Sequence, residues 1–201
     1  MVHLHRVKLD ANRDITEGAQ GDAEATIAWQ DFHRLVRDAK NAVNATYDGG
    51  FYIDLHGHGH DIQRLELGYL LDAEVLRLPD ASLDADPGHE VESSIRTLSV
   101  RSPLSFAELL RGPASLGALF EREGFPAVPS DSTPDPGTDA YFRGGYNSSL
   151  HGCRTGGTIC GVQIEANRIG VRDTEESRRR FAEALVEVVS EFVAVHYEIG
   201  I

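Results

Sequence analysis

The sequence predicts a layered α/β fold, in which helices cover a central sheet. First, residues 22–45 carry apolar side chains at the 3.6-residue spacing of one helix face. Second, the turn Asp48-Gly49-Gly50 ends this segment, and an apolar run follows it over residues 51–55, as expected of a buried strand. Third, a second apolar strand over residues 159–168 precedes another amphipathic segment. A helix, a tight turn and a buried strand in this order form an αβ unit.

The composition is that of a single globular domain. The chain has 201 residues, of which 41% are hydrophobic and 25% are charged, and this length suffices for a full core. No apolar run approaches the roughly 18 residues of a membrane-spanning helix, and the first residues lack the apolar core of a signal peptide. A formal net charge of −13 disfavours nucleic acid, because phosphates would be repelled. We expect one cytoplasmic domain over residues 1–201, without nucleic acid or membrane as a partner.

The two cysteines, Cys153 and Cys160, are too few for a disulfide scaffold. Their Cys-x6-Cys spacing is not that of a standard zinc knuckle. We expect both thiols to be reduced and structural.

The chain begins with alternating apolar and polar residues over 2–9, which predict a strand that ends at the polar turn 10–14. Either this strand lies at a sheet edge, or the chain is a shortened form of a longer protein. An exposed edge would favour pairing with another copy of the chain, as a homo-oligomer. The helix over residues 22–45 follows, and because His33 lies off its apolar stripe we expect this side chain to face solvent.

The most informative stretch is Phe51–His60, in which a strand runs into alternating histidines and glycines. Three histidines separated only by glycine, at His56, His58 and His60, are difficult to explain by core packing. Asp54 and His56 share a face on a strand, so the carboxylate could orient an imidazole that binds a metal. A metal or catalytic role is the favoured interpretation, and a solvated loop is the alternative.

Residues 62–71 alternate again and are expected to form a strand that returns beside the first, with Arg64 and Glu66 as a solubilising pair on its polar face. Residues 79–88 are turn-like, and two or three short helices follow. The polar, proline-rich segment 128–139 is expected to be a lid or a binding loop.

Residues 159–168 predict a buried strand with a charged end, on which Gln163 and Glu165 share a face. A glutamate at the end of an apolar strand is poorly solvated unless a positive group faces it, which indicates a functional role. The alternative is a structural salt bridge between Glu165 and Arg168.

A final amphipathic helix closes the domain. Asp173 is expected to cap this helix, with Glu176 at the capping-box position.

Polar groups at three strand ends suit one reaction: Asn12 with Arg13, His56 with its neighbours, and Glu165. In metal-assisted amide hydrolysis, zinc polarises the carbonyl and its bound water, and a free glutamate takes the water proton. An asparagine–arginine pair matches a substrate carboxylate, for which the planar guanidinium is well suited. These residues therefore predict zinc-dependent hydrolysis of an amide.

Four motifs, in this order, resemble the N-formylglutamate amidohydrolase family. They are Leu9-Asp-Ala-Asn-Arg-Asp14, Ile53-Asp-Leu-His-Gly-His58, Gly144-Gly-Tyr-Asn147 with His151-Gly152, and Gly161-Val-Gln-Ile-Glu-Ala-Asn-Arg168. That family is similar in fold to the zinc carboxypeptidases, so the resemblance implies a three-layer α/β/α domain with a mixed central sheet. It implies an amidohydrolase that cleaves the amide of an N-acylated amino acid, such as N-formylglutamate, or of a small peptide.

The resemblance also implies roles for individual residues. Asn12 and Arg13 match the pair that binds the substrate carboxylate, His56 matches a zinc ligand, and Glu165 matches the general base. The glycine-rich segment adds Tyr146 as a catalytic residue, and Arg143 and His151 as substrate contacts.

One departure from the family concerns the zinc ligands. The family supplies its first two ligands, a histidine and a glutamate, upstream of the Asn-Arg motif, whereas here only eleven residues precede Asn12 and none forms His-x-x-Glu. The chain is then a fragment, or it binds no zinc, or other histidines rebuild the zinc site. The histidines available for this are His58, His60, and His3 or His5.

Two other kinds of protein share features of this sequence. The run Asp54-Leu-His-Gly-His58 also fits metal-dependent amidohydrolases with a (β/α)8 barrel, but such a barrel typically needs about 250 residues and carries the motif on its first strand. The rival from another class is a binding module that holds an acidic amino acid or peptide without cleaving it. The missing upstream ligands support a binding module, whereas Glu165 favours an enzyme.

Overall fold

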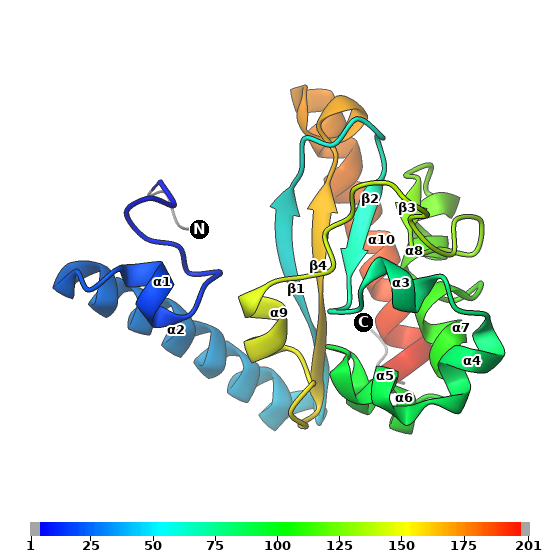
Figure 1. Ribbon diagram of the computed structural model, residues 1–201, viewed down its shortest axis with the longest axis horizontal. Helices are drawn as coiled ribbons and strands as arrows, with labels where there is room; N and C mark the ends of the chain where they lie inside the picture. The colour runs from blue at the N-terminus through cyan, green and yellow to red at the C-terminus, as the bar shows by residue number, and fades with distance from the viewer. Residues whose placement is uncertain (1–4, 198–201) are drawn as a thin grey trace.

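The computed structural model describes residues 5–197, and its fold is α/β. Four strands form one mixed sheet in the order β1–β4–β2–β3 (Figure 1). Their bounds are Gly50–Gly57 for β1, Leu65–Gly68 for β2, Ala127–Val128 for β3 and Ile159–Ala166 for β4. β4 runs parallel to β1 and antiparallel to β2, and β3 runs parallel to β2. The predicted α/β class is confirmed.

The helices fall into three groups along the chain. Two precede β1: α1 (Ile15–Ala19) and α2 (Ala23–Tyr47). Six lie between β2 and β3: α3 (Ala73–Leu76), α4 (Asp80–Ala85), α5 (Pro87–Glu92), α6 (Arg96–Arg101), α7 (Phe106–Arg111) and α8 (Leu116–Arg122). The last group comprises α9 (Tyr146–His151) before β4, then an irregular turn, η1 (Arg168–Arg172), and α10 (Glu175–Tyr197).

Helices cover both faces of the sheet. Successive side chains of β1 point to opposite faces. Phe51 contacts Phe192 of α10, with ring centroids 4.8 Å apart. The next residue, Tyr52, points the other way, and its ring lies 5.4 Å from that of His151 in α9. The main core fills the space between α10, the sheet and helices α6–α8.

The central strand is β4, and all eight of its residues are buried because it pairs on both sides and is covered on both faces. The prediction of a buried strand over residues 159–168 is confirmed, with the strand ending at Ala166. β1, by contrast, lies at one end of the described sheet, and Leu55 is 53% exposed.

Two strand predictions were wrong. Residues 5–9 form turns instead of a strand, with the Lys8 amide donating to the His5 carbonyl over 2.7 Å, and residues 1–4 lie outside the described part. Within residues 5–197 this segment pairs with no strand, because Leu9 packs with Ala19 and Ala25 in a small helical cluster instead. β2 is shorter than predicted and pairs with β4 and β3, so it does not return beside an N-terminal strand or β1.

Three predictions about helices also need correction. His33 is fully buried, because it packs against His151 and Tyr146 of α9, whereas Leu35 on the predicted apolar stripe is 58% exposed. Residues 79–88, expected to be a turn, lie mostly in α4 and α5. At the start of α10, Thr174 Oγ1 accepts from the Ser177 amide, so Thr174 takes the capping place predicted for Asp173. Val128 ends the short strand β3, and residues 129–139 contain neither helix nor strand, as predicted for a loop.

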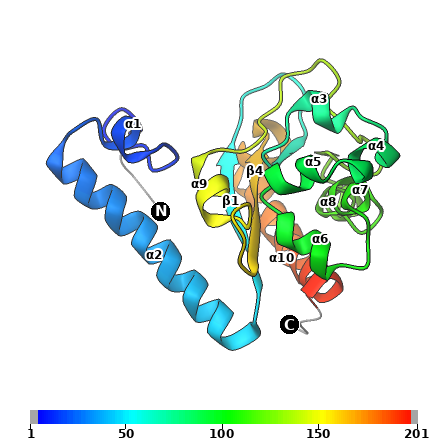
Figure 2. The same ribbon diagram turned by 60° about the horizontal axis from the view of Figure 1, so that its bottom comes forward.

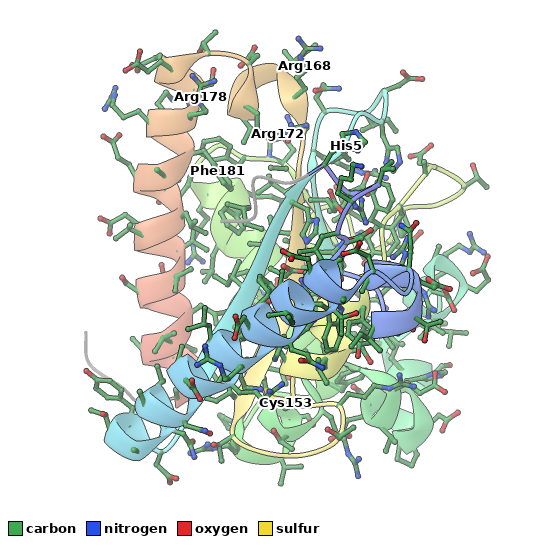
Figure 3. The ribbon with its side chains drawn as sticks, turned by 90° about the vertical axis from the view of Figure 1, so that its left-hand side faces the viewer. His5, Cys153, Arg168, Arg172, Arg178 and Phe181 are labelled. Carbon is green, nitrogen blue, oxygen red and sulfur yellow. A yellow bond between two sulfur atoms is a disulfide. The ribbon has the colours of Figure 1, made fainter. Side chains whose placement is uncertain are left out.

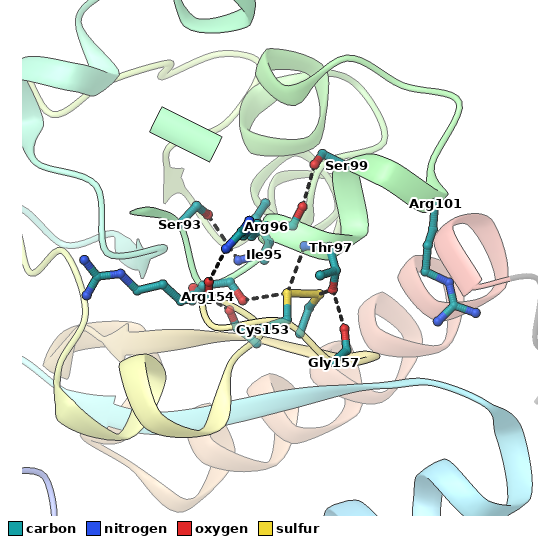
Figure 4. Close-up of a disulfide and its surroundings, with 12 residues drawn as sticks. Ser93, Ile95, Arg96, Thr97, Ser99, Arg101, Cys153, Arg154 and Gly157 are labelled. Carbon is teal, nitrogen blue, oxygen red and sulfur yellow. Dashed lines mark hydrogen bonds between the residues drawn. A yellow bond between two sulfur atoms is a disulfide. The ribbon is translucent and has the colours of Figure 1, made fainter. Parts of the chain in front are cut away.

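Cys153 and Cys160 form a disulfide, which corrects the prediction of reduced thiols (Figure 4). The two cysteines flank a tight loop in which Gly156 and Gly157 adopt positive φ angles of 103° and 93°, and this reversal brings the sulfurs together. Both cysteines are buried, and the Cys153 amide donates to the Ser94 carbonyl over 2.9 Å. The disulfide ties the end of α9 to the start of β4.

Candidate active site

Polar side chains form two rows across one face of the sheet. Strand register places His56 of β1 beside Glu165 of β4, and Glu165 beside Glu66 of β2. We call these three residues the cross-sheet row. The parallel row two residues earlier on β4 contains Asp54 and Gln163. β strands bury apolar residues more readily, so a polar face at the centre of a sheet indicates a functional surface.

Three carboxyl groups on this face are almost completely buried: Glu66 is 1%, Glu165 6% and Asp54 8% exposed. Burial, together with the charges of Glu66 and Asp54, raises the pKa of Glu165, while His56 and Gln163 oppose the increase. Burial would lower the pKa of His56, but Asp54 and Glu165 outweigh it and raise this pKa. The row therefore combines a carboxyl that holds a proton unusually well with an imidazole that favours its charged form.

An amide network fixes Glu165. Gln163 Nε2 donates to Glu165 Oε1 over 2.9 Å, and Gln163 Oε1 accepts from Asn12 Nδ2 over 3.3 Å. Asn12 Oδ1 in turn accepts from the backbone amide of Asn147 over 2.8 Å. Asn147 Nδ2 closes the network by donating to Asp54 Oδ1 over 3.3 Å. The Asn12 side chain is thus engaged within the protein and supports Glu165, where the sequence predicted contact with a substrate.

The histidine loop, residues 56–60, runs along the end of the sheet. The Arg172 guanidinium occupies the space beside Gly57, where a Cβ would lie 2.4 Å from its Cζ. Arg172 donates to the Ala166 carbonyl over 2.8 Å and to the His58 carbonyl over 2.6 Å. Figure 3 shows Arg168, Arg172 and Arg178 gathered where β4 passes into α10. A larger residue at position 57 would displace the Arg172 side chain, which in its present position holds the loop against the strand.

His58, His60 and Glu66 form a group whose donor atoms all lie within 4.8 Å of one another. Glu66 Oε1 lies 2.7 Å from His60 Nδ1 and 3.9 Å from His58 Nδ1. Ligands about 2.1 Å from a tetrahedral zinc ion lie about 3.4 Å apart, so a cation bound here would replace the 2.7 Å hydrogen bond between His60 and Glu66 and move these groups slightly apart. His58 Nε2 donates to the Arg64 carbonyl over 2.8 Å, the kind of contact that orients a metal-binding histidine.

The structure thus brings together two of the three predicted metal-binding histidines and adds Glu66. His56 lies apart from this group, with its Nε2 2.9 Å from Asp54 Oδ2. Sequence reasoning assigned Glu66 to a solubilising pair and missed its burial. The signal was present, because Glu66 stands between two leucines of a strand, the same context that identified Glu165.

The predicted substrate-binding residues line two separate cavities. A cavity of about 350 Å³ contains Arg13, Arg143 and Tyr146, together with Arg154 and the acidic residues Glu17 and Glu92; we call it the arginine cavity. A second cavity of about 310 Å³ contains Asn12, Asp54, His56, Asn147 and Phe32. Asn12 and Arg13 therefore face different cavities, although they are adjacent in the sequence.

Backbone packing positions Arg143. A Cβ on Gly68 would lie 2.4 Å from the Gly144 amide nitrogen, so only glycine allows the 143–144 backbone to cross β2 at this point. The Leu70 amide donates to the Arg143 carbonyl over 2.6 Å, and Arg143 Nε lies 3.3 Å from Asp72 Oδ1. The remaining predicted residue, His151, is 1% exposed and hydrogen-bonds to His33, so its contact with a substrate stays a prediction and its burial favours a role in holding α9.

None of the helices in the described part of the chain offers a stretch long and apolar enough to cross a membrane. Comparisons with models of protein families, with curated proteins and with solved structures found no match to this chain.

Proposed function

We propose that the protein is a metal-dependent amidohydrolase that acts on an N-acylated amino acid, such as N-formylglutamate, or on a short peptide. The cross-sheet row carries this proposal, because it sets a buried glutamate with a raised pKa beside a group suited to a cation. In this proposal His58, His60 and Glu66 hold zinc, and Glu165 is the general base. Bound zinc would polarise the amide carbonyl and acidify water.

The environment of Glu165 suits a base. A general base works best when its pKa lies near the working pH, and burial shifts Glu165 in that direction. The hydrogen bond from Gln163 holds one carboxyl oxygen, Oε1, and in this proposal the other oxygen, Oε2, takes the proton. After the proton moves to Glu165, the same group can return it to the leaving amine.

The arginine cavity supplies recognition of an anionic group. Arg13 and Arg143 can pair with the substrate carboxylate, for which a guanidinium is well matched. Tyr146 lies at the same cavity and offers a hydroxyl that could donate to the oxyanion.

Membership of the N-formylglutamate amidohydrolase family, and a fold like that of the zinc carboxypeptidases, belong to the same proposal. The four motifs of the sequence support it. In that resemblance His56 is itself a zinc ligand, whereas its contact with Asp54 also suits an imidazole held beside Glu165. Variants of the individual histidines separate these two arrangements.

The test is the zinc content of the purified protein, measured by mass spectrometry, together with hydrolysis of N-formylglutamate. We expect near-stoichiometric zinc that is lost in His58→Ala and kept in His56→Ala. Glu165→Gln should keep zinc and substrate binding, and should lose at least about a hundredfold in turnover, the lower range for a general base. Loss of zinc in His56→Ala alone would place the metal at His56, and wild-type protein without zinc and without turnover would contradict the proposal.

One observation favours a second candidate function, a binding module. His58 Nδ1 accepts from the His60 amide over 3.1 Å, and Glu66 Oε2 accepts from the Phe142 amide over 2.8 Å, so the group is satisfied without a cation. Binding of N-formylglutamate by calorimetry, without zinc and with no turnover in the wild type or in Glu165→Gln, would establish this function.

The proposal extends to partners and location. A small anionic molecule is the partner, and the free edge of β1 makes pairing with another copy a prediction that light scattering can test. Location in the cytoplasm stays a prediction, and the disulfide is a feature more typical of an oxidising compartment.

A further inference from the structure

The N-terminal segment, residues 9–47, has a small core of its own. Leu9, Ala19 and Ala25 form a cluster with Trp29 and Ile15 that is separate from the main core. Figures 1 and 2 both place α1 and α2 on one side of the molecule, beyond β1 and α9. A segment with its own cluster and few deep contacts can open as a unit at low free-energy cost.

This segment covers the candidate site. Asn12 and Phe32 line the cavity that contains Asp54 and His56, and Arg13 lines the arginine cavity. Asn12 also supports the amide network through Gln163. The position of the segment therefore decides whether both cavities are complete.

A histidine pair makes the deepest contact between this segment and the rest of the molecule. Of the 25 residues of α2, only Ala25 and His33 are buried. His33 Nδ1 lies 2.8 Å from Nε2 of His151 in α9, and the two rings are stacked at 26°. His33 is 0% and His151 is 1% exposed, so neither ring contacts solvent.

The surroundings of the pair disfavour a positive charge. α2 contributes the cations Arg37 and Lys40, and Lys40 donates to the His151 carbonyl over 2.5 Å. β1 contributes the anion Asp54, whose Oδ1 already accepts from Tyr52 and Asn147.

The other neighbours of the pair are neutral. Trp29 of α2 and Tyr146 of α9 contribute aromatic rings, at 4.0 Å and 5.7 Å from the His33 ring. The Ala11 carbonyl lies near His33, but His33 Nε2 makes no hydrogen bond within the described part of the chain. Burial thus lowers the pKa of His33, and burial with the nearby His33, Lys40 and Arg37 lowers the pKa of His151 to about 4.

We propose that residues 9–47 form a lid that is held closed by the neutral His33–His151 pair and is released when the pair takes up protons. A first proton would place a charge in a buried contact beside two cations. A second proton would leave two donors facing each other, because a protonated imidazole has no acceptor. The proposal concerns access to the site and does not depend on the hydrolase activity.

The effect of pH on the lid follows from the pKa values of the two histidines in the closed and open states. In the open state the histidines titrate near the ordinary pKa of 6.5, whereas His151 in the closed state takes up a proton only near pH 4. Between these values the open state binds more protons, so falling pH favours opening by up to about tenfold per pH unit for each proton. Above pH 6.5 the lid is fully favoured in its closed position.

Hydrogen exchange with mass spectrometry, corrected for intrinsic rates, tests the lid from about pH 8 to about pH 4. Peptides of residues 9–47 should lose protection below pH 6.5, while those of β4 keep theirs. Trp29 is the one tryptophan of the chain, and its ring contacts that of His33 at a centroid distance of 4.0 Å, so its fluorescence should change over the same range.

The decisive variant is the double substitution His33→Asn and His151→Gln. Asparagine and glutamine place an amide near the former Nδ1 and Nε2 positions, can hydrogen-bond to each other, and do not titrate. We expect this variant to stay closed throughout the range. The matched control is His196→Gln, which removes a buried histidine on α10 that contacts the Ala114 carbonyl, and which should open as the wild type does.

Three results would overturn the lid. They are unchanged protection of residues 9–47 in the wild type, simultaneous loss of protection in β4, and opening of the double variant with the wild-type pH dependence. If the double variant does not fold, the wild type alone still tests the proposal. Peptides of residues 9–47 must then lose protection at a higher pH than peptides of β4, and loss in the reverse order or at the same pH would contradict the lid.

Discussion

Gln163 is the residue on which the site geometry most depends. It is 3% exposed, and its amide makes one hydrogen bond to Glu165 and one to Asn12. An amide can donate and accept at the same time, which no carboxylate or ammonium side chain does in its charged form. Gln163 thereby joins the N-terminal segment to the proposed base.

Gln163→Leu should destabilise the protein by about 2–4 kcal/mol, because two buried partners each lose a hydrogen bond. The free energy of unfolding in urea measures this loss. Gln30→Leu on the exposed face of α2 is the control and should stay within about 0.5 kcal/mol of the wild type. Equal effects of the two substitutions would mean that the amide network contributes nothing to stability.

For a single residue, the sequence predicts burial when the neighbouring residues along the chain are apolar. Glu165 stands out because it ends a run of apolar residues, and the structure buries it. His33 could not be placed in the same way. Its burial depends on His151, which lies 118 residues later and meets it only through the tertiary fold.

Among the elements, β4 organises the others, since it holds β1 and β2 on either side and carries both Gln163 and Glu165. Its hydrophobicity made it predictable as a strand. The neighbours of β2 were not predictable, because a strand from about a hundred residues later inserts beside it. Hydrophobic periodicity identifies elements and contains no information about such long-range pairing.

The disulfide fixes the start of β4, and its removal in the double variant Cys153→Ser, Cys160→Ser should lower stability. The sequence separation is 7 residues, and closing so short a loop contributes about 2–3 kcal/mol in the chain-entropy account. Unfolding in urea under non-reducing conditions measures the loss.

A reductant provides the control for this prediction. It should lower the stability of the wild type by a similar amount and leave the serine variant unchanged. Two free thiols in the folded wild type, counted under non-reducing conditions, would show that the cysteines are not joined.

For the whole molecule, the formal net charge of −13 is the main electrostatic property. A surplus of one sign destabilises a compact state through self-repulsion. The ion pairs at the surface are mostly local, such as those of Arg179 with Glu176 and Glu183, and exposed pairs contribute little. Repulsion should therefore outweigh attraction in the response of the protein to salt.

Raising NaCl from about 10 mM to about 150 mM should increase the melting temperature, because the screening length falls from about 30 Å to about 8 Å. Glu187→Lys on the exposed face of α10 is the matched variant, since it changes the formal charge from −13 to −11. It should melt higher than the wild type at low salt and gain less from added salt. Potassium chloride at equal ionic strength should give the same increase, because screening does not depend on the identity of the cation. A melting temperature that falls with salt would mean that attractive ion pairs, and not the surplus of negative charge, dominate the electrostatics of this fold.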